Sequence, residues 1–536
     1  MNKFFLPALL WIGIVSLSLA QQNVILIIAD DMGTDYCGFY EDAKDTANMP
    51  NIRGLLPRGV RFTSAWANPL CSPTRAGMLT GRYAFRTGVG TALSGSTAAQ
   101  LDTAEISIGK LLKNAAPIPY ATANIGKWHL NVQTTQSLFY PNLMGFDHYS
   151  GNFLGEIPNY FDWKKTTNGS SPTNTTIYAT TETVNDAIQW LDGLNGNQPF
   201  FLWLAFNAPH TPFHQPPAAL HTVPGLTGTI MDINQNPKKY FRAMIEAMDT
   251  ETGRLLQWLD QNGQLDSTNI IFIGDNGNAR RVSQIVDTSQ YKGTIYEYGI
   301  HVPFVIAGPA VESPGRVSDA LVNTTDLFAT ILELAGFELW PTAIPADKPV
   351  DAKSLLPILK NQNTAVRDWN FSEQFMPVSG PNDGKTIRDI QYKLLHFDDG
   401  HQEFYYLTDN LLEQNDLLTQ PLTSEATDHY VYLCTKLSQL IGTNTCNPIF
   451  TSTEDERLNN GLNVYPNPSS GIFYVKNSGP SMALSIQVFD MAGVKKSQFE
   501  RTSDYTKIDI SALPTGVYML QVQHEAGIYQ KLVVKY

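Results

Sequence analysis

Acidic and amide side chains follow two apolar segments of the sequence, at the points where buried strands would end. Their carboxylate and amide oxygens suit a hard divalent cation. Each acid taken alone could equally be a helix cap or a turn residue. Two acid-rich ends in one sheet favour a metal site, and we expect its ligands to be Asp30, Asp31, Asp275 and Asn276.

Nucleophilic and cationic side chains form a second set of candidates. Cys71 opens the run CSPTR, and Lys127 and His129 lie together in the run GKWHL. Such a cysteine alone is most simply a residue in a proline turn, and such a pair alone is most simply a surface lysine and a packed histidine. A cluster of cations would attract an anion even on an acidic protein. Arg75 ends the run that Cys71 opens, and His210 follows another of the predicted strands.

The overall composition excludes some functions. The chain has 536 residues and a formal net charge of −13, so a nucleic acid is not expected as its main partner, because phosphate binding needs a basic face. Four cysteines in so long a chain exclude a disulfide scaffold. Cys434 and Cys446 lie close enough in sequence for a local disulfide, which spacing alone does not establish. Cys37 is expected to be a packed thiol.

The first twenty residues are typical of a secretory signal peptide. Lys3 gives a short positive start, Phe4–Leu19 is apolar, and Ser18-x-Ala20 is a small-residue cleavage site before Gln21. A membrane anchor is the alternative, but the apolar run is short and lacks a stop-transfer flank. No later stretch is apolar enough to span a bilayer, so we expect an exported protein without a transmembrane segment.

Buried strands alternate with helices over the larger part of the chain. The predicted parallel strands are the apolar runs Asn23–Ala29, Phe200–Phe206, Asn269–Gly274 and Pro303–Ala307. One helix is predicted from Pro237 to the stop signal Asn262-Gly263, and another over Thr325–Gly336. The alternation predicts an α/β fold with a large, mostly parallel sheet flanked by helices. Ligands of such sheets bind at the carboxyl ends of the strands, where the candidate residues lie.

The C-terminal part of the chain is organised differently. Short antiparallel strands are predicted at Tyr392–His396 and Glu403–Leu407, within a small α+β subdomain. Residues 451–462 are polar and patternless, as in a linker. From residue 463 onward, alternating segments between Gly, Pro and Asn turns predict a β-sandwich. Its predicted strands are Ile472–Val475, Leu484–Phe489, Lys507–Ile510, Val517–Gln523 and Gln530–Val534.

The predicted sandwich resembles the C-terminal sorting domain of type IX secretion, found in polysaccharide-degrading bacteria. The resemblance rests on VYPNP from Val464, DMAG from Asp490, LPTGVY from Leu513 and the basic end at Lys535. It implies the type IX secretion machinery as a partner and a secreted or cell-surface location. A carbohydrate-binding or spacer sandwich is the alternative.

Roughly residues 22–450 resemble the type I sulfatases of the alkaline phosphatase superfamily. The motifs, in family order, are CSPTR from Cys71, LTGR from Leu79, GKWHL from Gly126, APHTP from Ala208 and KGTIYE from Lys292. In that family a formylglycine-generating enzyme oxidises the cysteine to Cα-formylglycine. The aldehyde hydrate attacks sulfur with one hydroxyl and expels sulfate with the other, whereas a serine could attack but could not regenerate itself. A helix over Arg75–Arg82 would direct its positive end at the sulfate.

The resemblance also implies a role for each candidate. The four acid and amide ligands would bind calcium, or occasionally magnesium, together with the modified residue at position 71. Lys127 and Lys292 would hold sulfate oxygens, and His129 would take a proton from the second hydroxyl. His210 would bind sulfate and protonate the leaving alcohol. Arg75 would brace the hydrate and its loop through its fork of donors.

Some positions depart from the family pattern. Tyr298 stands where glycine is common, and His301 stands where arginine is common. Neither is a core catalytic position, but both prevent the transfer of a substrate subsite from the family. His214 is either a subsite residue or a structural one. The aromatic residues of Tyr149–Phe161, with Trp163, either stack on sugar rings or pack the loop.

The sequence therefore predicts an exported sulfatase that hydrolyses sulfate monoesters on carbohydrates such as ulvan, fucoidan, carrageenan or glycosaminoglycans. Two alternatives stay open: a phosphate or phosphonate monoester hydrolase of the same superfamily, and an unmodified, inactive sulfatase-like protein that binds anionic glycans. The expected parts are a signal peptide (1–20), a catalytic α/β domain (21–364), an α+β subdomain (365–450), a linker (451–462) and a β-sandwich sorting domain (463–536).

Overall fold

The computed structural model describes most of the chain after the expected signal peptide. The described residues are 22–93, 99–132, 137–194, 196, 198–285, 289–376, 380, 382–407, 412–446, 462–477, 483–490, 494–500, 505–524 and 527–536. The predicted signal peptide, and the predicted linker up to residue 461, lie outside the described residues. Over the described residues, no helix combines the length and the hydropathy that a membrane crossing needs.

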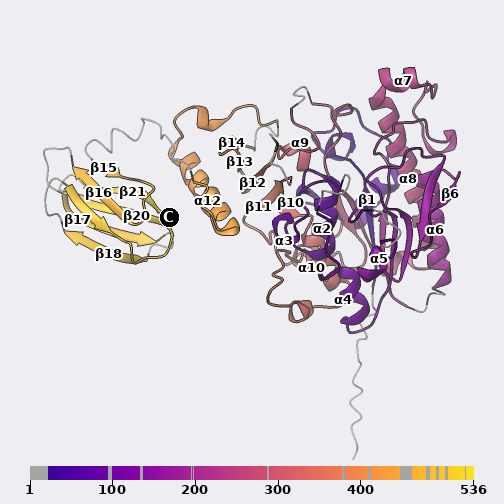
Figure 1. Cartoon of the computed structure of the whole chain (residues 1–536), viewed down its shortest axis with the longest axis horizontal. Helices are drawn as coiled ribbons and strands as arrows, with labels where there is room; N and C mark the ends of the chain where they lie inside the picture. Colours follow the sequence, from indigo (N-terminus) through magenta and orange to yellow (C-terminus); the bar gives the residue numbers. More distant parts are fainter. Residues whose placement is uncertain are drawn as a thin grey trace, which may run out of the picture.

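A ten-stranded sheet forms the centre of the larger part of the molecule (Figure 1). Five neighbouring strands, from β8 to β4, run parallel, as predicted for β1, β7 and β8. In sheet order the strands are β10 (Arg316–Asn323), β2 (Gly59–Trp66), β9 (Phe304–Ala307), β8 (Thr268–Gly274), β1 (Asn23–Ala29), β7 (Phe200–Ala205), β3 (Ala121–Lys127), β4 (His148–Asn152), β5 (Trp163–Thr167) and β6 (Thr173–Thr175).

The predicted direction of Pro303–Ala307 is wrong. Strand β9 pairs antiparallel with both of its neighbours, β8 and β2. A strand parallel to β8 would need a crossover connection that returns the chain to the end of the sheet where β8 begins. After β8 the chain instead forms a long loop, whose described residues include the short helix α9 (Glu297–Ile300), and β9 begins beside the end of β8. The loop between these strands carries several of the candidate residues.

Both faces of the sheet are buried, as alternate residues of β1 demonstrate. Val24, Leu26 and Ile28 pack into one hydrophobic cluster, and Ile25 and Ile27 pack into the other. The predicted helices at 237–262 and 325–336 are confirmed as α8 and α10. Helices on the first face are α2 (Cys71–Thr80), α4 (Ile108–Asn114) and α10 (Asp326–Leu334); those on the second are α1 (Pro50–Arg53), α6 (Ala179–Gly193) and α8 (Pro237–Gln261).

A four-stranded antiparallel sheet with one long helix follows the large sheet (Figure 1). Its apolar face packs against α12, and the disulfide Cys434–Cys446 joins that helix to the segment after it. Cys37 is a buried free thiol, as predicted. The elements are β11 (Asn370–Gln374), β12 (Gly384–Arg388), β13 (Tyr392–Phe397), β14 (Gln402–Tyr406) and α12 (Ser424–Ile441). Further short α-helices among the described residues are α3 (Ala84–Thr87), α5 (Tyr140–Leu143), α7 (Ile230–Gln235) and α11 (Leu356–Leu359).

The C-terminal region is a sandwich of two antiparallel sheets, beyond α12 in Figure 1. Apolar residues of both sheets, including Phe473, Val488 and Leu520, form its core. The five predicted strands are present, and the predictions missed β15 and β18. One sheet contains β15 (Leu462–Tyr465), β16 (Ile472–Asn477) and β19 (Tyr505–Asp509); the other contains β18 (Lys495–Glu500), β17 (Ala483–Asp490), β20 (Gly516–His524) and β21 (Gly527–Lys535).

Candidate active site

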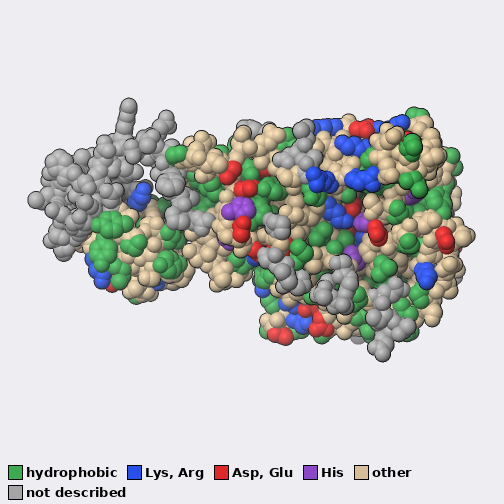
Figure 2. All heavy atoms as spheres, turned by 45° about the horizontal axis from the view of Figure 1, so that its top comes forward, with side chains coloured by type: hydrophobic (Ala, Val, Ile, Leu, Met, Phe, Trp, Pro, Cys, Tyr) green, Lys and Arg blue, Asp and Glu red, His purple; other side chains and the backbone are tan. Residues whose placement is uncertain are grey.

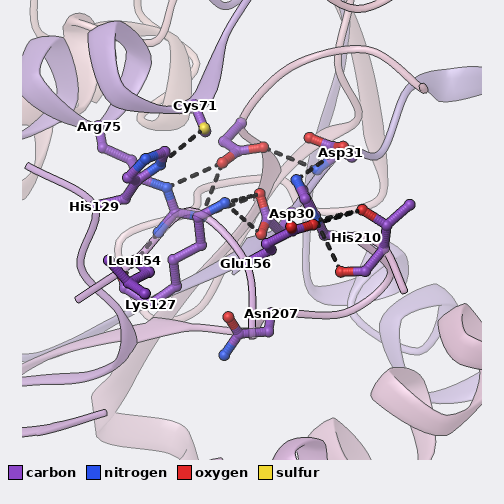
Figure 3. Close-up of polar contacts among 12 residues, drawn as sticks. Asp30, Asp31, Cys71, Arg75, Lys127, His129, Leu154, Glu156, Asn207 and His210 are labelled. Atoms are coloured by element: carbon purple, nitrogen blue, oxygen red, sulfur yellow. Dashed lines mark hydrogen bonds and ion pairs between the residues drawn. The ribbon is translucent and has the colours of Figure 1, made fainter. Parts of the chain in front are cut away.

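The predicted site residues come together at the carboxyl ends of the parallel strands. Figure 3 shows this for Asp30, Asp31, Cys71, Arg75, Lys127, His129 and His210. Asp30-Asp31 follows β1, Lys127 ends β3, His210 follows β7, Asp275-Asn276 follows β8, and Cys71 begins the helix after β2. Most of these side chains are buried, while those of His210 and Lys292 are partly exposed. Parallel strands end at the same edge of a sheet, so residues far apart in sequence meet there.

Helix α2 starts earlier than predicted, at Cys71 itself, and ends at Thr80 rather than Arg82. Pro73 lies in the first helical turn, where a missing backbone N–H breaks no helical hydrogen bond. Gly81 ends the helix with a φ of 71°. The side chain of Cys71 therefore leaves from a helix N-terminus, where free N–H groups and the helix dipole favour an anion.

His129 contacts Cys71. Its Nδ1 lies 3.1 Å from the Sγ atom of Cys71, and its Nε2 lies 3.0 Å from the carbonyl oxygen of Leu93. Since a carbonyl only accepts, Nε2 carries the hydrogen and Nδ1 presents a lone pair to position 71. Burial, with the nearby charge of Lys127, lowers the pKa of His129 well below its usual value and keeps the ring neutral. Position 71 thus faces the lone pair of an unprotonated ring nitrogen.

Arg75 ties α2 to two strand ends. Its Nε and Nη2 donate to Oδ2 of Asp275 at 3.0 and 2.8 Å, and its Nη1 donates to the carbonyl oxygen of Lys127 at 2.9 Å. Burial raises the pKa of Asp275, but the charges of Arg75 and Lys127 more than offset this and lower it below its usual value. The guanidinium fork therefore holds Asp275 as a carboxylate in one orientation.

The other two carboxylates are each paired with a lysine. The Nζ of Lys127 lies 2.8 and 2.6 Å from the two carboxylate oxygens of Asp30, and the Nζ of Lys292 lies 2.6 Å from Oδ1 of Asp31. Burial raises the pKa of Asp30 well above its usual value in spite of Lys127. For Asp31 the charges of His210 and Lys292 outweigh burial and lower the pKa. A further cation would thus stabilise the ionised form of Asp30.

The donor set fits a divalent metal ion. The Oδ1 atom of Asn276 is buried and has no hydrogen-bond partner among the described residues, while its Nδ2 donates to Asp31 at 2.9 Å. Leaving such an oxygen unpaired costs about 1–3 kcal/mol, which a ligated cation would recover. Ligand atoms of Asp30, Cys71 and Asp275 lie within 4.8 Å of one another. Three carboxylates and one amide oxygen are the ligands that calcium and magnesium prefer.

His210 lies on the opposite side of the carboxylates from Cys71 (Figure 3). Its Nδ1 lies 3.0 Å from the carbonyl oxygen of Thr211, and its Nε2 lies 3.6 Å from Oδ2 of Asp31. Tyr160 donates to the carbonyl oxygens of Asn207 and His210, which fixes the turn after β7. Burial lowers the pKa of His210 to about 3 in spite of Asp31, so the ring is neutral near pH 7.

Several residues that were candidates for sugar contacts are structural. Tyr149, Phe153, Tyr160 and Trp163 are buried, and among the aromatic residues of that segment Phe161 is exposed. The set therefore packs the loop, apart from Phe161. His214 packs against Tyr160 with ring centroids 4.2 Å apart and contacts the hydroxyl of Tyr178 at 3.0 Å. His301 contacts the carbonyl oxygen of Thr63 at 2.8 Å.

Sequence reasoning missed the exposed residues that flank the site. Leu154 and Glu156 lie in the loop after β4 and reach the site region (Figure 3). No motif distinguishes them, and exposed loop residues carry no hydrophobic periodicity that a sequence pattern could reveal. Figure 2 shows Lys and Arg side chains gathered on one face of the part of the molecule that contains the ten-stranded sheet, with histidine atoms visible among them.

Three parts of the chain match known families. Residues 22–337 match the sulfatase family, residues 290–440 match the N-sulphoglucosamine sulphohydrolase C-terminal family, and residues 463–535 match the secretion system C-terminal sorting domain. The sorting domain makes the chain a secreted or cell-surface protein of a bacterium.

Relatives and solved structures agree with these matches. N-acetylgalactosamine-6-sulfatase of Rattus norvegicus is 29% identical over 393 residues, which cover 67% of this chain and 70% of the relative. The sulfatase YdeN of Escherichia coli is 27% identical over 482 residues, which cover 74% of this chain and 82% of the relative. The crystal structure of Ps i-CgsB with k-i-k-neocarrahexaose is 26% identical with a TM-score of 0.66, and the match covers 82% of this chain and 98% of that one. The chain belongs to the sulfatase family and is a sulfuric ester hydrolase.

Proposed function

We propose that this enzyme hydrolyses sulfate monoesters on sulfated carbohydrates, with Cys71 oxidised to Cα-formylglycine. One observation carries the proposal: the Cys71 side chain leaves the N-terminus of α2, 3.1 Å from a neutral histidine and beside carboxylates that fit a metal ion. The aldehyde hydrate would supply one hydroxyl for attack on sulfur and a second for release of sulfate. A thiol in the same place has no such second group.

Asp30, Asp31, Asp275 and Asn276 would hold the calcium ion. Bound there, the ion would polarise a sulfate oxygen and lower the pKa of the attacking hydroxyl. Through its two hydrogen bonds, Arg75 keeps Asp275 ionised and oriented for this ion. Asp31 adopts a left-handed backbone with a φ of 66°, a strained conformation of the kind that functional sites retain.

The remaining side chains would manage charge and protons. His129 has its Nδ1 lone pair directed at position 71, so it would accept the proton of the second hydroxyl as sulfate leaves. Once a divalent cation binds Asp30 and Asp31, the ammonium groups of Lys127 and Lys292 would be less fully neutralised by these carboxylates. They could then form charge-assisted hydrogen bonds with the sulfate. A bound sulfate adds negative charge beside His210, which raises the pKa of that ring and favours its protonated form as the donor to the leaving alcohol.

The substrate class rests on relatives and on export. One curated relative is named an N-acetylgalactosamine-6-sulfatase, and one similar solved structure holds a neocarrahexaose, an oligosaccharide. A secreted or cell-surface enzyme meets polymers and their fragments rather than intracellular metabolites. Sulfated sugars of polysaccharides or derived oligosaccharides are therefore the proposed substrates.

The test combines one chemical and one kinetic measurement. Peptide mass spectrometry across residue 71, on protein from a host with a formylglycine-generating enzyme, should detect the aldehyde or its hydrate. The same protein should release sulfate from members of a panel of mono- and disulfated galactose, N-acetylgalactosamine, glucosamine and fucose and their oligosaccharides. Phosphate monoesters serve as the control substrates. A wholly unmodified thiol, or faster cleavage of the phosphate esters, would overturn the proposal.

Calcium should stabilise the protein through Asn276. Adding calcium to chelator-treated protein is expected to raise the thermal midpoint, because a ligand at one hundred times its Kd adds about 2.7 kcal/mol to the free energy of unfolding. Asn276→Leu keeps the volume but removes the orphaned oxygen, so its midpoint should rise much less. Differential scanning fluorimetry measures both shifts, and sulfate release should follow the same order. Equal shifts in the two proteins would contradict this ligand assignment.

A further inference from the structure

Residues 153–162, the segment between β4 and β5, flank the candidate site. This segment contacts His129 directly and approaches His210 through Thr211. The backbone N–H of His129 donates to the carbonyl oxygen of Phe153 at 3.1 Å, which holds the start of this segment. Gly155 then lies against the His129 ring, because a Cβ atom at position 155 would stand 2.5 Å from Cε1 of that ring. Only glycine permits this close approach of the backbone to the ring.

Glu156, the next residue, is exposed at the edge of the site (Figure 3). Its Oε2 accepts a hydrogen bond from the Thr211 hydroxyl at 3.1 Å, and the same hydroxyl oxygen lies 3.2 Å from Nδ1 of His210. The Glu156 carboxylate is therefore separated by a single hydroxyl from the ring that would protonate the leaving alcohol.

The Glu156 carboxylate differs from the buried carboxylates of the site in its ion pairing. The buried carboxylates are paired with Arg75, Lys127 or Lys292. The hydrogen-bond donor of Glu156 is a neutral hydroxyl, and no described cation forms an ion pair with its carboxylate. An exposed carboxylate without a cation keeps a free oxygen that accepts a hydrogen bond from a sugar hydroxyl. The same oxygen repels an anionic substituent.

We propose that Glu156 selects sugars whose ring substituents beside the scissile sulfate are uncharged hydroxyls, and disfavours a second sulfate or a carboxylate there. The inference rests on the proposed function and specifies its substrate class. Gly155 and Thr211 fix the position of the selecting carboxylate, so they are positioning residues. The cations of the site thus bind the scissile sulfate, and the Glu156 carboxylate repels a second sulfate.

The test compares each hydrolysed monosulfated sugar of the panel with its counterpart that carries a second sulfate on the same ring. Glu156→Gln keeps the shape and the acceptor for Thr211 but removes the charge. We expect its ratio of kcat/KM for disulfated over monosulfated sugar to rise about fivefold over the wild-type ratio, mainly through KM of the disulfated sugar. Asp162→Asn, which removes an exposed acid of the same segment, is the matched control and should leave the ratio unchanged.

Salt provides a second readout. Raising the ionic strength shortens the Debye length from about 30 Å at 0.01 M to about 3 Å at 1 M. The wild-type preference for monosulfated sugars should therefore weaken with salt, whereas that of Glu156→Gln should change little. An active enzyme whose ratio is the same in wild type and Glu156→Gln would overturn the inference and leave the proposed function intact. A protein that releases sulfate from no member of the panel would overturn both.

Discussion

Cys71→Ala is expected to abolish sulfate release, with kcat reduced by a factor of about 10⁴ or more, as when a catalytic nucleophile is removed. Alanine offers no group for attack on sulfur, while the proposed metal ligands and the cations remain. The fold should persist, because the substitution removes a polar interaction of Sγ with Nδ1 of His129. One such interaction contributes about 1 kcal/mol. Ion chromatography of released sulfate measures the activity, and circular dichroism checks the fold.

Cys71→Ser separates attack from regeneration. The serine hydroxyl would keep a nucleophile at the helix N-terminus beside His129, but it lacks the second hydroxyl that expels sulfate. We expect at most one equivalent of alcohol per enzyme, retained sulfate on the peptide that contains residue 71, and no turnover. The alcohol is counted by quenched flow and the modified peptide by mass spectrometry. Sustained turnover in either variant would contradict the assignment of position 71 as the nucleophile.

The residues of the site could be predicted because strand ends and motifs are local features of the sequence. Asp30 and Asp275 follow uninterrupted apolar runs, and parallel strands end at one edge, so their meeting follows from the fold class. Spacing alone does not decide whether Cys434 and Cys446 pair, and in the structure the two residues are bonded. The formation of this disulfide depends on where the segment after α12 folds back, which is a tertiary property.

The errors concern features that depend on the path of the chain in space. Strand β9 has the composition of a buried parallel strand, since Phe304–Ala307 is buried on both faces, yet it runs antiparallel. The composition of a strand indicates whether it is buried. Its direction depends on the end of the sheet to which the preceding loop brings the chain. The predicted start of α2 is too late because Pro73 suggests a turn, although proline fits the first helical turn equally well. Glu156 gives no sequence signal because its role depends on Gly155 and Thr211 beside it.

Removing Arg75 should have the largest effect on stability. Arg75→Met removes the guanidinium donors from Oδ2 of Asp275 and from the carbonyl oxygen of Lys127, both of which are buried. Breaking a buried charge pair on one side costs about 3–5 kcal/mol. Arg75→Lys keeps the charge but loses the planar fork, so it should cost less in stability and still reduce kcat, since one ammonium cannot hold both acceptors in the same geometry. Urea unfolding of the whole protein and steady-state kinetics measure the two effects.

The double variant Arg75→Met with Asp275→Asn distinguishes a structural role from an electrostatic one. The amide removes the uncompensated charge, so the free energy of unfolding should recover most of what Arg75→Met loses. Sulfate release should stay abolished, because the site has then lost both the guanidinium fork and one of the proposed carboxylate ligands. Recovery of stability would show that the cost of Arg75→Met is the uncompensated charge of Asp275, and continued inactivity would show that removing this charge does not restore the site. If activity recovered together with stability, neither Asp275 nor its pairing with Arg75 would be needed for the reaction.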